Sequence, residues 1–289
     1  MTPHEPDQST RPPHRVGRFF KILTWSALLA GLASLAIWGV WSREEWLSRR
    51  LMLVAEAKWR QDDFLGAMRD YEKIIDAYPK SNVVPEAYYW KGVGSFLYFD
   101  DPKTAVAALQ KVIQLESARG ISVHDISAQG YLAEIYEKAL KQPTKAIIAH
   151  EEILYKSHDA DLILKSRYKI GELYYALGDL SQARIEWDVL VEKAPNSRWA
   201  PAALYRKAGT YFVTGACEKA VPVYQTLYTE YPEDENSLHA KFRAANCFEM
   251  QNQFTEARSL YQSLKDAYPD PKLIEQKVER LDRKIRKAS

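Results

Sequence analysis

Residues 222–234 read PVYQTLYTEYPED, and residues 259–271 read SLYQSLKDAYPDP. In both stretches a Tyr precedes a Tyr-Pro pair by seven residues, and a Leu follows that first Tyr by three. Residues at these spacings share one face of a helix, and Pro ends a helix because it has no backbone N–H to donate. Each stretch therefore predicts the last turns of a helix, and the pair predicts an internal repeat.

The repeat extends over most of the chain and is marked by Ala at a regular spacing. The marker positions are Ala67, Ala105, Ala146, Ala183, Ala220 and Ala257, at intervals of 38, 41, 37, 37 and 37 residues. A larger side chain follows each marker by four residues, one turn along the same face: Tyr71, Leu109, His150, Trp187, Tyr224 and Tyr261. In four segments Pro follows the marker by twelve residues: Pro79, Pro195, Pro232 and Pro269. We expect each marker to lie in the second helix of a helical hairpin.

A first helix precedes each marker and carries a small residue followed by a large one. Residues 171–183, GELYYALGDLSQA, place Gly171 and Tyr174 before a Gly-Asp turn, and residues 208–220 and 245–257 repeat this order. Small residues let two helices approach closely, and hairpins of this kind bury their apolar faces by stacking on their neighbours. The chain is therefore expected to form an α-solenoid.

These residues resemble the tetratricopeptide repeat family over residues 43–271. The resemblance implies an all-α fold with a right-handed solenoid of about six helical hairpins, closed by a capping helix at residues 272–289. The period of mostly 37 residues exceeds the usual 34 of the family, which implies about one extra turn per hairpin. Pro102 and Pro143 replace the Gly-Asp turn, and His150 stands where an aromatic residue or Leu is usual.

A narrower resemblance rests on the segment AYYWKG at residues 87–92 and on three Tyr-Pro pairs. The pairs occur at residues 78–79, 231–232 and 268–269. Together they look most like bacterial envelope members of the family, the outer-membrane assembly lipoprotein BamD and the division coordinator CpoB (YbgF). The layout is similar to that of the translocon-associated protein YfgM, which has a single N-terminal anchor. The resemblance implies protein partners among envelope or secretion components.

The segment before the repeats, FFKILTWSALLAGLASLAIWGVW at residues 19–41, carries no charge from Ile22 to Val40. About 20 such residues are needed to span the hydrocarbon core of a bilayer. We therefore predict a transmembrane anchor at residues 19–42. A cleaved signal peptide is the alternative, but the apolar run continues beyond the candidate cleavage site at residues 31–33, so a retained anchor is the better prediction.

The orientation of the anchor follows from the basic residues beside it, which favour the cytoplasmic side of a membrane. Basic residues without nearby acids precede the anchor: Arg11, Arg15, Arg18 and Lys21. After the anchor, Arg43, Arg49 and Arg50 are interleaved with Glu44 and Glu45. We expect a disordered cytoplasmic tail at residues 1–18, an anchor in the bacterial inner membrane, and repeats in the periplasm.

Charge and residue spacing exclude several classes of function. The 289-residue chain has a net charge of +2, and this excess lies within its first 42 residues. A neutral remainder argues against nucleic-acid binding, which needs a basic stripe. The six His residues show no metal-ligand spacing, and the two Cys residues form no CxxC motif. We expect no enzyme, no catalytic or metal site, no cofactor and no small-molecule substrate.

A partner-binding groove is expected along the first helices, which line the concave side of solenoids in the resembled family. Residues seven apart share a helix face. On that face we place Trp59, Tyr89, Phe96, Tyr168, Glu172, Tyr175, Tyr205, Phe212, Phe242 and Asn246, with Met52 and Glu56 at its start. An aromatic stripe suits a bound peptide. The alternative is that many of these rings pack between helices.

A disulfide between Cys217 and Cys247 is expected if the repeats are exported. In stacked hairpins a first helix packs antiparallel on the preceding second helix, so the end of one meets the start of the other. An oxidising compartment lets the two thiols join if their Cα atoms approach within about 7 Å. The alternative is a pair of small, buried core residues.

Three functions remain compatible with the sequence. The first is a membrane-anchored scaffold that binds other proteins during envelope assembly, division or secretion. The second is a membrane-linked chaperone that holds unfolded exported chains, which would need a broad apolar groove. The third is a scaffold of the opposite orientation, with its repeats in the cytoplasm as a receptor.

Overall fold

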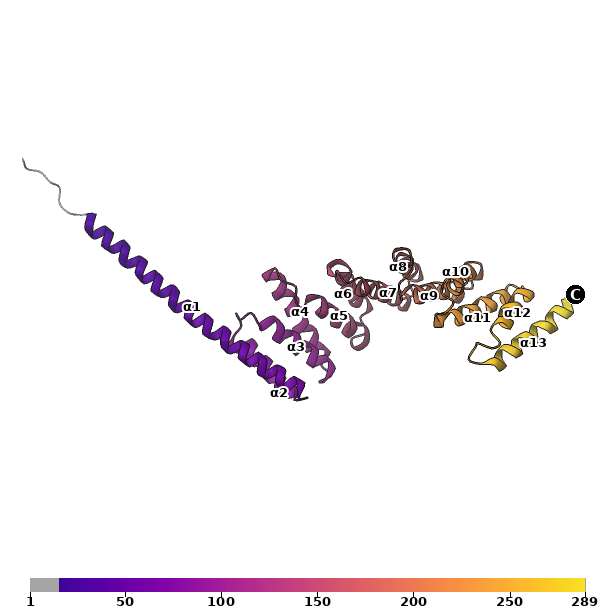
Figure 1. Cartoon of the computed structure of the whole chain (residues 1–289), viewed down its shortest axis with the longest axis horizontal. Helices are drawn as coiled ribbons and strands as arrows, with labels where there is room; N and C mark the ends of the chain where they lie inside the picture. The colour runs from indigo at the N-terminus through magenta and orange to yellow at the C-terminus, as the bar shows by residue number, and fades with distance from the viewer. Residues whose placement is uncertain (1–15, 289) are drawn as a thin grey trace, which may run out of the picture. The chain divides into compact units, whose positions relative to one another are not determined.

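The computed structural model describes residues 16–288, except for the side chains of residues 16–30, 32, 35–37 and 288. The chain divides into two compact units, unit 1 up to Gly94 and unit 2 from Ser95 onward. Within residues 16–288 the fold is all-α, and no strand occurs there. Figure 1 labels the helices in chain order.

Unit 1 contains the long helix α1 (Val16–Arg60), helix α2 (Phe64–Ala77) and most of α3 (Val84–Leu97). Helix α1 continues without a break from Ser42 to Arg60, so no linker separates the apolar segment from the first repeat. Its start at Val16 makes residues 16–18 helical, so the predicted tail is too long by three residues. No Pro occurs between Pro13 and Pro79, so no residue within α1 lacks the backbone N–H that a continuous helix needs.

Among the described residues, no helix combines the length and the apolar content that crossing a membrane requires. Most of the predicted anchor at residues 19–42 belongs to the part of α1 whose side chains lie outside the described residues. Residues 1–15 of the predicted tail also lie outside them.

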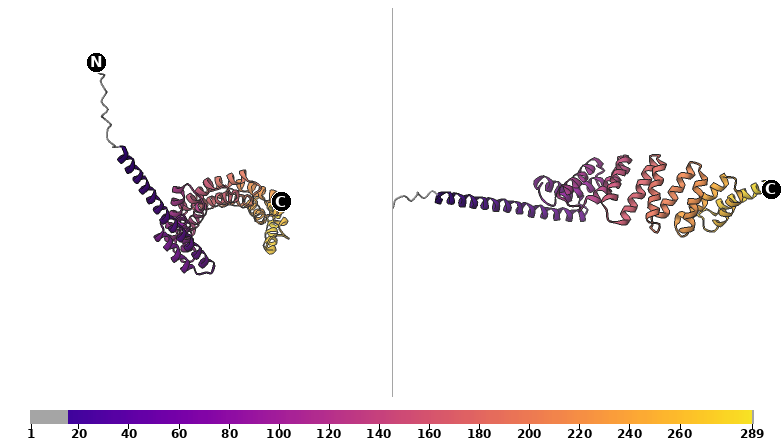
Figure 2. Two further views of the ribbon diagram at one scale, coloured as in Figure 1. Left: turned by 60° about the vertical axis from the view of Figure 1, so that its left-hand side comes forward. Right: turned by 90° about the horizontal axis from the view of Figure 1, so that it is seen from above.

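Unit 2 is a solenoid of helices that follow one another along an arc, plainly seen in Figure 2. Its helices are α4 (Pro102–Arg119), α5 (Asp125–Glu134) with the π-helical turn η1 (Ile135–Ala139), α6 (Pro143–Lys156), α7 (Ala160–Ala176), α8 (Leu180–Lys193), α9 (Ala200–Val213), α10 (Cys217–Glu230), α11 (Glu235–Met250), α12 (Phe254–Ser263) and α13 (Pro271–Ala288). Helices α5 to α12 form consecutive hairpins, and each hairpin packs on the next.

The backbone repeats with the same spacing as the Ala markers. One residue in each turn that precedes α2, α4, α6, α8, α10 and α12 has a positive φ angle: Asp62, Asp100, Lys141, Gly178, Gly215 and Asn252. Each of these residues lies five positions before a marker, and the next helix begins two residues later. The left-handed conformation costs a non-Gly residue roughly 1–2 kcal/mol. Four non-Gly residues adopt it, so the stacking of the hairpins outweighs that local cost.

The core of the hairpins consists of the residues that the repeat predicts. All six Ala markers are fully buried, and so are the residues one turn later except His150, which retains 9% exposure. At Gly171 the missing side chain lets the Trp187 indole approach the backbone, and its Nε1 donates a hydrogen bond to the Tyr168 carbonyl oxygen at 3.3 Å. A Cβ at position 171 would lie 2.7 Å from Cε2 of that ring.

Helix α13 closes unit 2 against α12. Ile274 and Leu281 are buried beside Tyr261 and Leu264, whereas most of the remaining α13 residues face solvent. A helix with one apolar stripe and one polar face suits the end of a solenoid, where no further hairpin follows to cover it. The side of α13 that packs carries Ile274, Val278 and Leu281.

Candidate protein-binding surface

The first helices of three hairpins in unit 2 contribute a set of half-buried side chains, which we call the aromatic face. Its members are Tyr168, Glu172 and Tyr175 of α7, Tyr205 and Phe212 of α9, and Phe242 and Asn246 of α11. Tyr175 is the most open of them, at 38% exposure. All seven belong to the groove expected from the sequence.

Three members of the aromatic face meet in one pocket of about 170 Å³. Its walls consist of Tyr175, Tyr205, Phe212, Val213, Gly209, Tyr224, Arg206 and Arg243. The sequence prediction missed both arginines. A signal for them was present, because each directly follows a residue placed on the face, but a basic residue on a helix surface is too common to single out.

Both arginines are held by aromatic or acidic neighbours. The Arg206 Nε lies 2.8 Å from a Glu172 carboxylate oxygen and donates to the Tyr168 hydroxyl at 3.4 Å. Burial raises the pKa of Tyr168 above its ordinary value, so its hydroxyl stays protonated well beyond neutral pH. The Arg243 guanidinium carbon lies 4.8 Å from the centre of the Phe212 ring, in cation–π geometry. The pocket thus joins apolar walls to two fixed positive charges.

The α11 end of the aromatic face is closed by internal contacts. The Phe242 ring stacks on Tyr268 with centroids 4.9 Å apart and meets Tyr261 edge-on at 5.5 Å. The Asn246 Oδ1 accepts hydrogen bonds from the Tyr261 hydroxyl at 2.7 Å and from the Lys277 ammonium at 2.9 Å. Asn246 therefore fastens α12 and α13 to α11, and the sequence prediction of a groove residue missed this role.

The predicted groove residues of unit 1 pack among rings of their own. Trp59 has its ring centroid 5.2 Å from those of Phe64 and Trp90, and Tyr89 lies 5.3 Å from Trp90. Met52 is a core residue with 3% exposure, so its assignment to the groove was wrong.

Glu56 and Phe96 are not among the residues that line the pocket. The Glu56 carboxylate pairs with Arg60 one turn later at 3.1 Å, on the surface of α1. Phe96, near the end of α3, is half-buried. For Trp59 and Tyr89, the alternative that the rings pack between helices describes the contacts that the structure contains.

The structure brings the two cysteines together. Cys217 begins α10, Cys247 lies near the end of α11, and their Cα atoms are 5.2 Å apart with the sulfur atoms joined. Both side chains are buried, in a core that includes Tyr224 and Ala244. This is the antiparallel meeting of helix end and helix start that the repeat implied.

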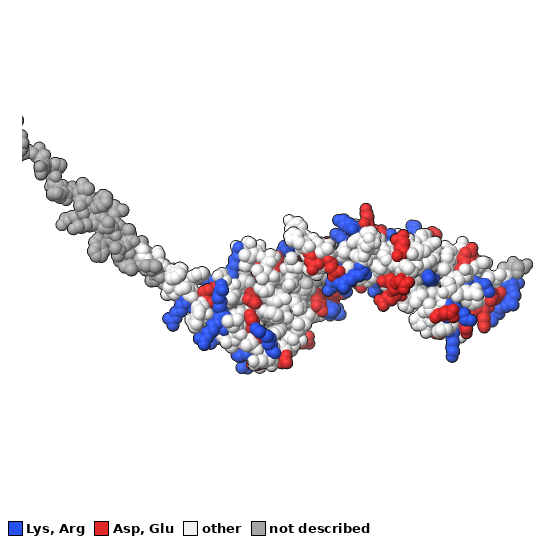
Figure 3. Space-filling view, in the orientation of Figure 1, with Lys and Arg blue, Asp and Glu red and all other residues white. Residues whose placement is uncertain are grey.

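Charges and metal ligands add no second kind of site to this surface. Over the face of unit 2 seen in Figure 3, Lys and Arg alternate with Asp and Glu. Within the described part of the chain, His, Cys, Asp and Glu form no group that could hold a metal ion. The surface chemistry that remains is aromatic, with paired arginine and glutamate side chains.

Comparison with known proteins agrees with the repeat. Residues 51–81, 165–197 and 239–271 match the family model described as tetratricopeptide repeat. These segments contain the Ala markers of α2, α8 and α12. No curated protein matches the chain.

Several solved structures are similar to the chain at low sequence identity. A tetratricopeptide repeat protein from Parabacteroides merdae is 15% identical, with a TM-score of 0.52, covering 83% of this chain and 91% of that one. The C-terminal part of a repeat-containing protein from Cytophaga hutchinsonii is 16% identical, with a TM-score of 0.55, covering 74% and 78%. PilW, a type IV pilus biogenesis factor, is 12% identical, with a TM-score of 0.47, covering 81% and 98%.

At these identities the first two similarities show the fold and leave the function open. The same repeat is seen in the spacing of the Ala markers, in the left-handed turn residues of the backbone and in the three segments that match the family model. The chain therefore contains tetratricopeptide repeats within a solenoid of helical hairpins.

Proposed function

We propose that the protein is a membrane-anchored scaffold that binds a segment of another protein on the aromatic face of unit 2. The observation that carries this proposal is the pocket in which Tyr175, Tyr205 and Phe212 meet Arg206 and Arg243. Aromatic and arginine side chains dominate the energetics of protein interfaces because they bury large areas and keep hydrogen-bond donors. A partner segment with an aromatic or aliphatic anchor beside a carboxylate suits these walls.

The setting that we propose is the bacterial envelope. The uncharged run from Ile22 to Val40 supports an anchor in the inner membrane, and the basic residues before it support a cytoplasmic N-terminus. The repeats then lie in the periplasm, in keeping with the resemblance to BamD, CpoB and YfgM. No catalytic role is proposed, because the aromatic face brings together no nucleophile with an adjacent base.

Site-specific photocrosslinking in the native host tests the binding surface. A photoreactive amino acid at Val213, which lines the pocket and is 60% exposed, is expected to capture one or a few defined partners. The same amino acid at Ile185, 51% exposed on α8 and outside this pocket, is the matched control. Tyr175→Glu and Phe212→Glu are expected to abolish the capture at position 213 while the protein stays folded. Capture that persists in both variants contradicts the proposed surface.

Orientation has a separate test. Alkaline phosphatase fused to the C-terminus is expected to be active, and green fluorescent protein at the same place is expected to be dark. The opposite result supports a cytoplasm-facing receptor and contradicts the periplasmic location, without affecting the proposed binding surface.

A holdase chaperone is the second candidate, favoured by exposed apolar side chains near the turns of unit 2. Leu97 is 51% exposed, Phe99 is 41% exposed and Val123 is 70% exposed. A holdase is expected to suppress the aggregation of unrelated unfolded proteins at stoichiometric amounts. A scaffold with one defined partner is not, so a light-scattering assay separates the two.

A further inference from the structure

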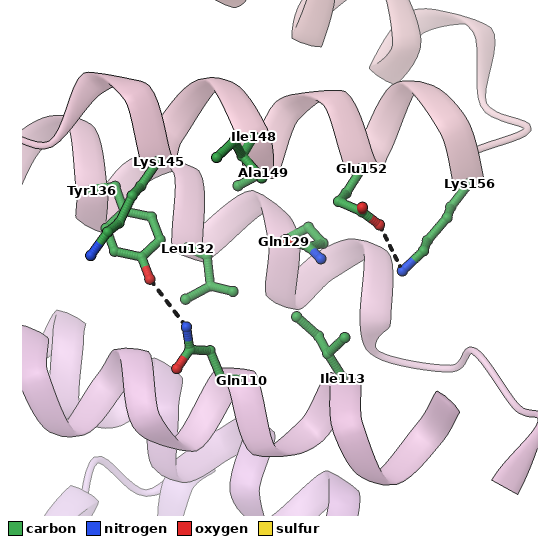
Figure 4. Close-up of a pocket in the computed structure, with 10 residues that line it drawn as sticks. All are labelled: Gln110, Ile113, Gln129, Leu132, Tyr136, Lys145, Ile148, Ala149, Glu152 and Lys156. Atoms are coloured by element: carbon green, nitrogen blue, oxygen red, sulfur yellow. Dashed lines mark hydrogen bonds and ion pairs between the residues drawn. The ribbon is translucent and has the colours of Figure 1, made fainter. Parts of the chain in front are cut away.

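A second pocket of unit 2, about 460 Å³ in volume, lies between α4, α5 and α6. Figure 4 shows its walls: Gln110 and Ile113 from α4, Gln129 and Leu132 from α5, Tyr136 from η1, and Lys145, Ile148, Ala149, Glu152 and Lys156 from α6. None of these residues belongs to the aromatic face. Ligand pockets typically have volumes of about 300–1,000 Å³, so the space is large enough for part of a peptide.

The polar group at the centre of this pocket is the Gln129 side chain. Gln129 is only 7% exposed, and no group within the described residues forms a hydrogen bond with its amide. In Figure 4 the side chain lies in the gap between the ribbons of α4 and α6. The amide does not belong to the side-chain groups that are both fully buried and unpaired, so it opens into the pocket, and a ligand that covers it has to replace the water that it meets there. A ligand that offers one donor and one acceptor satisfies it.

Around Gln129 the pocket is apolar. Leu132 forms part of the α5 wall and Ile113 part of the α4 wall, while Ile148 on α6 remains 54% exposed. Covering the exposed part of Ile148 removes apolar area from water, which favours the binding of a ligand there. The walls therefore suit a ligand that carries both a peptide group and an aliphatic side chain.

One end of the pocket has a positive charge without a counterion. The Lys145 ammonium lies 5.4 Å from the centre of the Tyr136 ring, and no carboxylate of the described residues lies within ion-pair distance of it. The Tyr136 hydroxyl in turn accepts a hydrogen bond from the Gln110 amide at 3.3 Å. At the other end Lys156 is already paired, with Glu152 and Asp125, each at 3.0 Å. A bound acidic group is therefore attracted to the Lys145 end.

The π-helical turn contributes to this arrangement. Tyr136 belongs to η1, where the helix widens by one residue between α5 and the following turn. Such turns are rare and are frequently found at functional sites. Here the turn carries the ring that supports the Lys145 ammonium.

We propose that this pocket binds an extended peptide segment with an aliphatic residue two positions before an acidic one. The Gln129 amide pairs with the main-chain N–H and C=O of the segment. The aliphatic side chain packs on Ile113, Leu132 and Ile148, and the acidic side chain pairs with Lys145. Side chains two apart on an extended chain point the same way, which gives the pattern its spacing.

The length of the pocket fits a short segment. Lys145 and Lys156 are eleven residues apart on α6, which corresponds to roughly 16 Å along the helix axis. An extended chain covers that distance in about five residues. The occupant is therefore a peptide stretch of another protein, distinct from the segment proposed for the aromatic face.

The test uses the full chain in detergent micelles and fluorescein-labelled hexapeptides of the pattern Leu-x-Asp, with x varied through the set. Fluorescence anisotropy is expected to give dissociation constants below about 1 mM for part of the set. Gln129→Leu is expected to weaken the best binder about tenfold, because it removes two hydrogen bonds and keeps the volume. Gln114→Leu, the same change at an exposed position of α4 outside the pocket, is expected to leave binding unchanged.

A charge reversal separates recognition from stability. Lys145→Glu is expected to lose the Leu-x-Asp peptides and to gain binding of the matched Leu-x-Lys set, which a merely unfolded variant cannot do. Ile148→Asp, at an exposed position, is expected to abolish binding with an unchanged melting temperature. Tyr175→Glu and Phe212→Glu are expected to leave binding of the Leu-x-Asp peptides intact, since both residues belong to the aromatic face. The proposal is wrong if no peptide of the set binds below about 1 mM, or if Gln129→Leu and Lys145→Glu bind as the unaltered chain does.

Discussion

The Cα atoms of Cys217 and Cys247 lie 5.2 Å apart, where the start of α10 meets the end of α11. The two residues are separated by 30 positions in the chain. A bridge of that separation removes conformational freedom from the unfolded chain and typically stabilises a protein by about 3 kcal/mol. The pair therefore links unit 2 to the redox state of its compartment.

We predict that protein isolated from its native envelope contains no free thiol when it is denatured without reductant. Reduction is expected to lower the melting temperature, and the Cys217→Ser/Cys247→Ser double variant is expected not to respond to reductant. Two labelled thiols in the unreduced, denatured material contradict both the disulfide and the periplasmic location.

His150 is expected to make the fold less stable in mild acid. Burial lowers the pKa of His150 to about 4, and the nearby Lys169 and Lys165 of α7 act in the same direction. The unfolded chain has the ordinary value of about 6.5, so it binds a proton that the folded protein excludes. The free energy of unfolding therefore falls as the pH drops from about 6.5 to 4, by up to about 3 kcal/mol.

Urea unfolding at several pH values measures this dependence. His150→Leu is the matched variant, because Leu109 occupies the equivalent position one repeat earlier and is fully buried. The variant is expected to have a flatter dependence between pH 6.5 and 4. An unchanged slope shows that other groups are responsible.

Glu249 is expected to hold the capping helix in place. Its carboxylate lies 3.4 Å from the ammonium groups of Lys277 and Lys284 and 2.7 Å from an Arg280 guanidinium nitrogen, all on α13. Burial opposes the ionisation of Glu249, but Lys277 and Arg280 outweigh it and lower its pKa. Since the folded pKa is lowered, this stabilisation is present above the ordinary value of about 4.5 and is lost as the pH falls through the folded pKa.

Glu249→Gln is therefore expected to destabilise α13 at pH 7 by about 2 kcal/mol, since it leaves partly buried cations without their carboxylate. Hydrogen exchange is the measurement, and the loss of protection should be concentrated in residues 271–288. Glu279→Gln, an exposed change on α13 itself, serves as the control. Equal protection in the two variants contradicts the assigned role.

Two glycines in helices are expected to respond oppositely to the same substitution. Gly171→Ala forces a methyl group against the Trp187 indole, and crowding of this kind costs about 1–3 kcal/mol. Gly130→Ala on α5 meets nothing within 4 Å and is expected to gain up to about 1 kcal/mol from helix propensity. The melting temperatures of the two variants measure these effects. A higher melting temperature for Gly171→Ala contradicts the close approach of α7 and α8.

The sequence by itself determined the hairpins. The interval between Ala markers is also the interval between the left-handed turn residues, from Asp62 to Asn252, and each marker is buried as its small size predicted. These features are local: an Ala or a turn residue acts on the helix in which it lies or on the next one. Because the same Ala marker and turn residue recur in six segments, the pattern can be recognised although single segments differ from it.

Only the tertiary structure decided what the surface residues do. Tyr175 and Phe212 share one pocket, whereas Asn246, predicted for the same groove, is bound to Tyr261 and Lys277. Gln129 gave no signal in the sequence, because its place in the pocket wall depends on which groups α4 and α6 bring beside it. Contacts of this kind form between helices that are separate in the chain. Which residues meet depends on the angle at which each hairpin packs on the next. The repeat fixes where such helices begin and end, but it does not fix that angle.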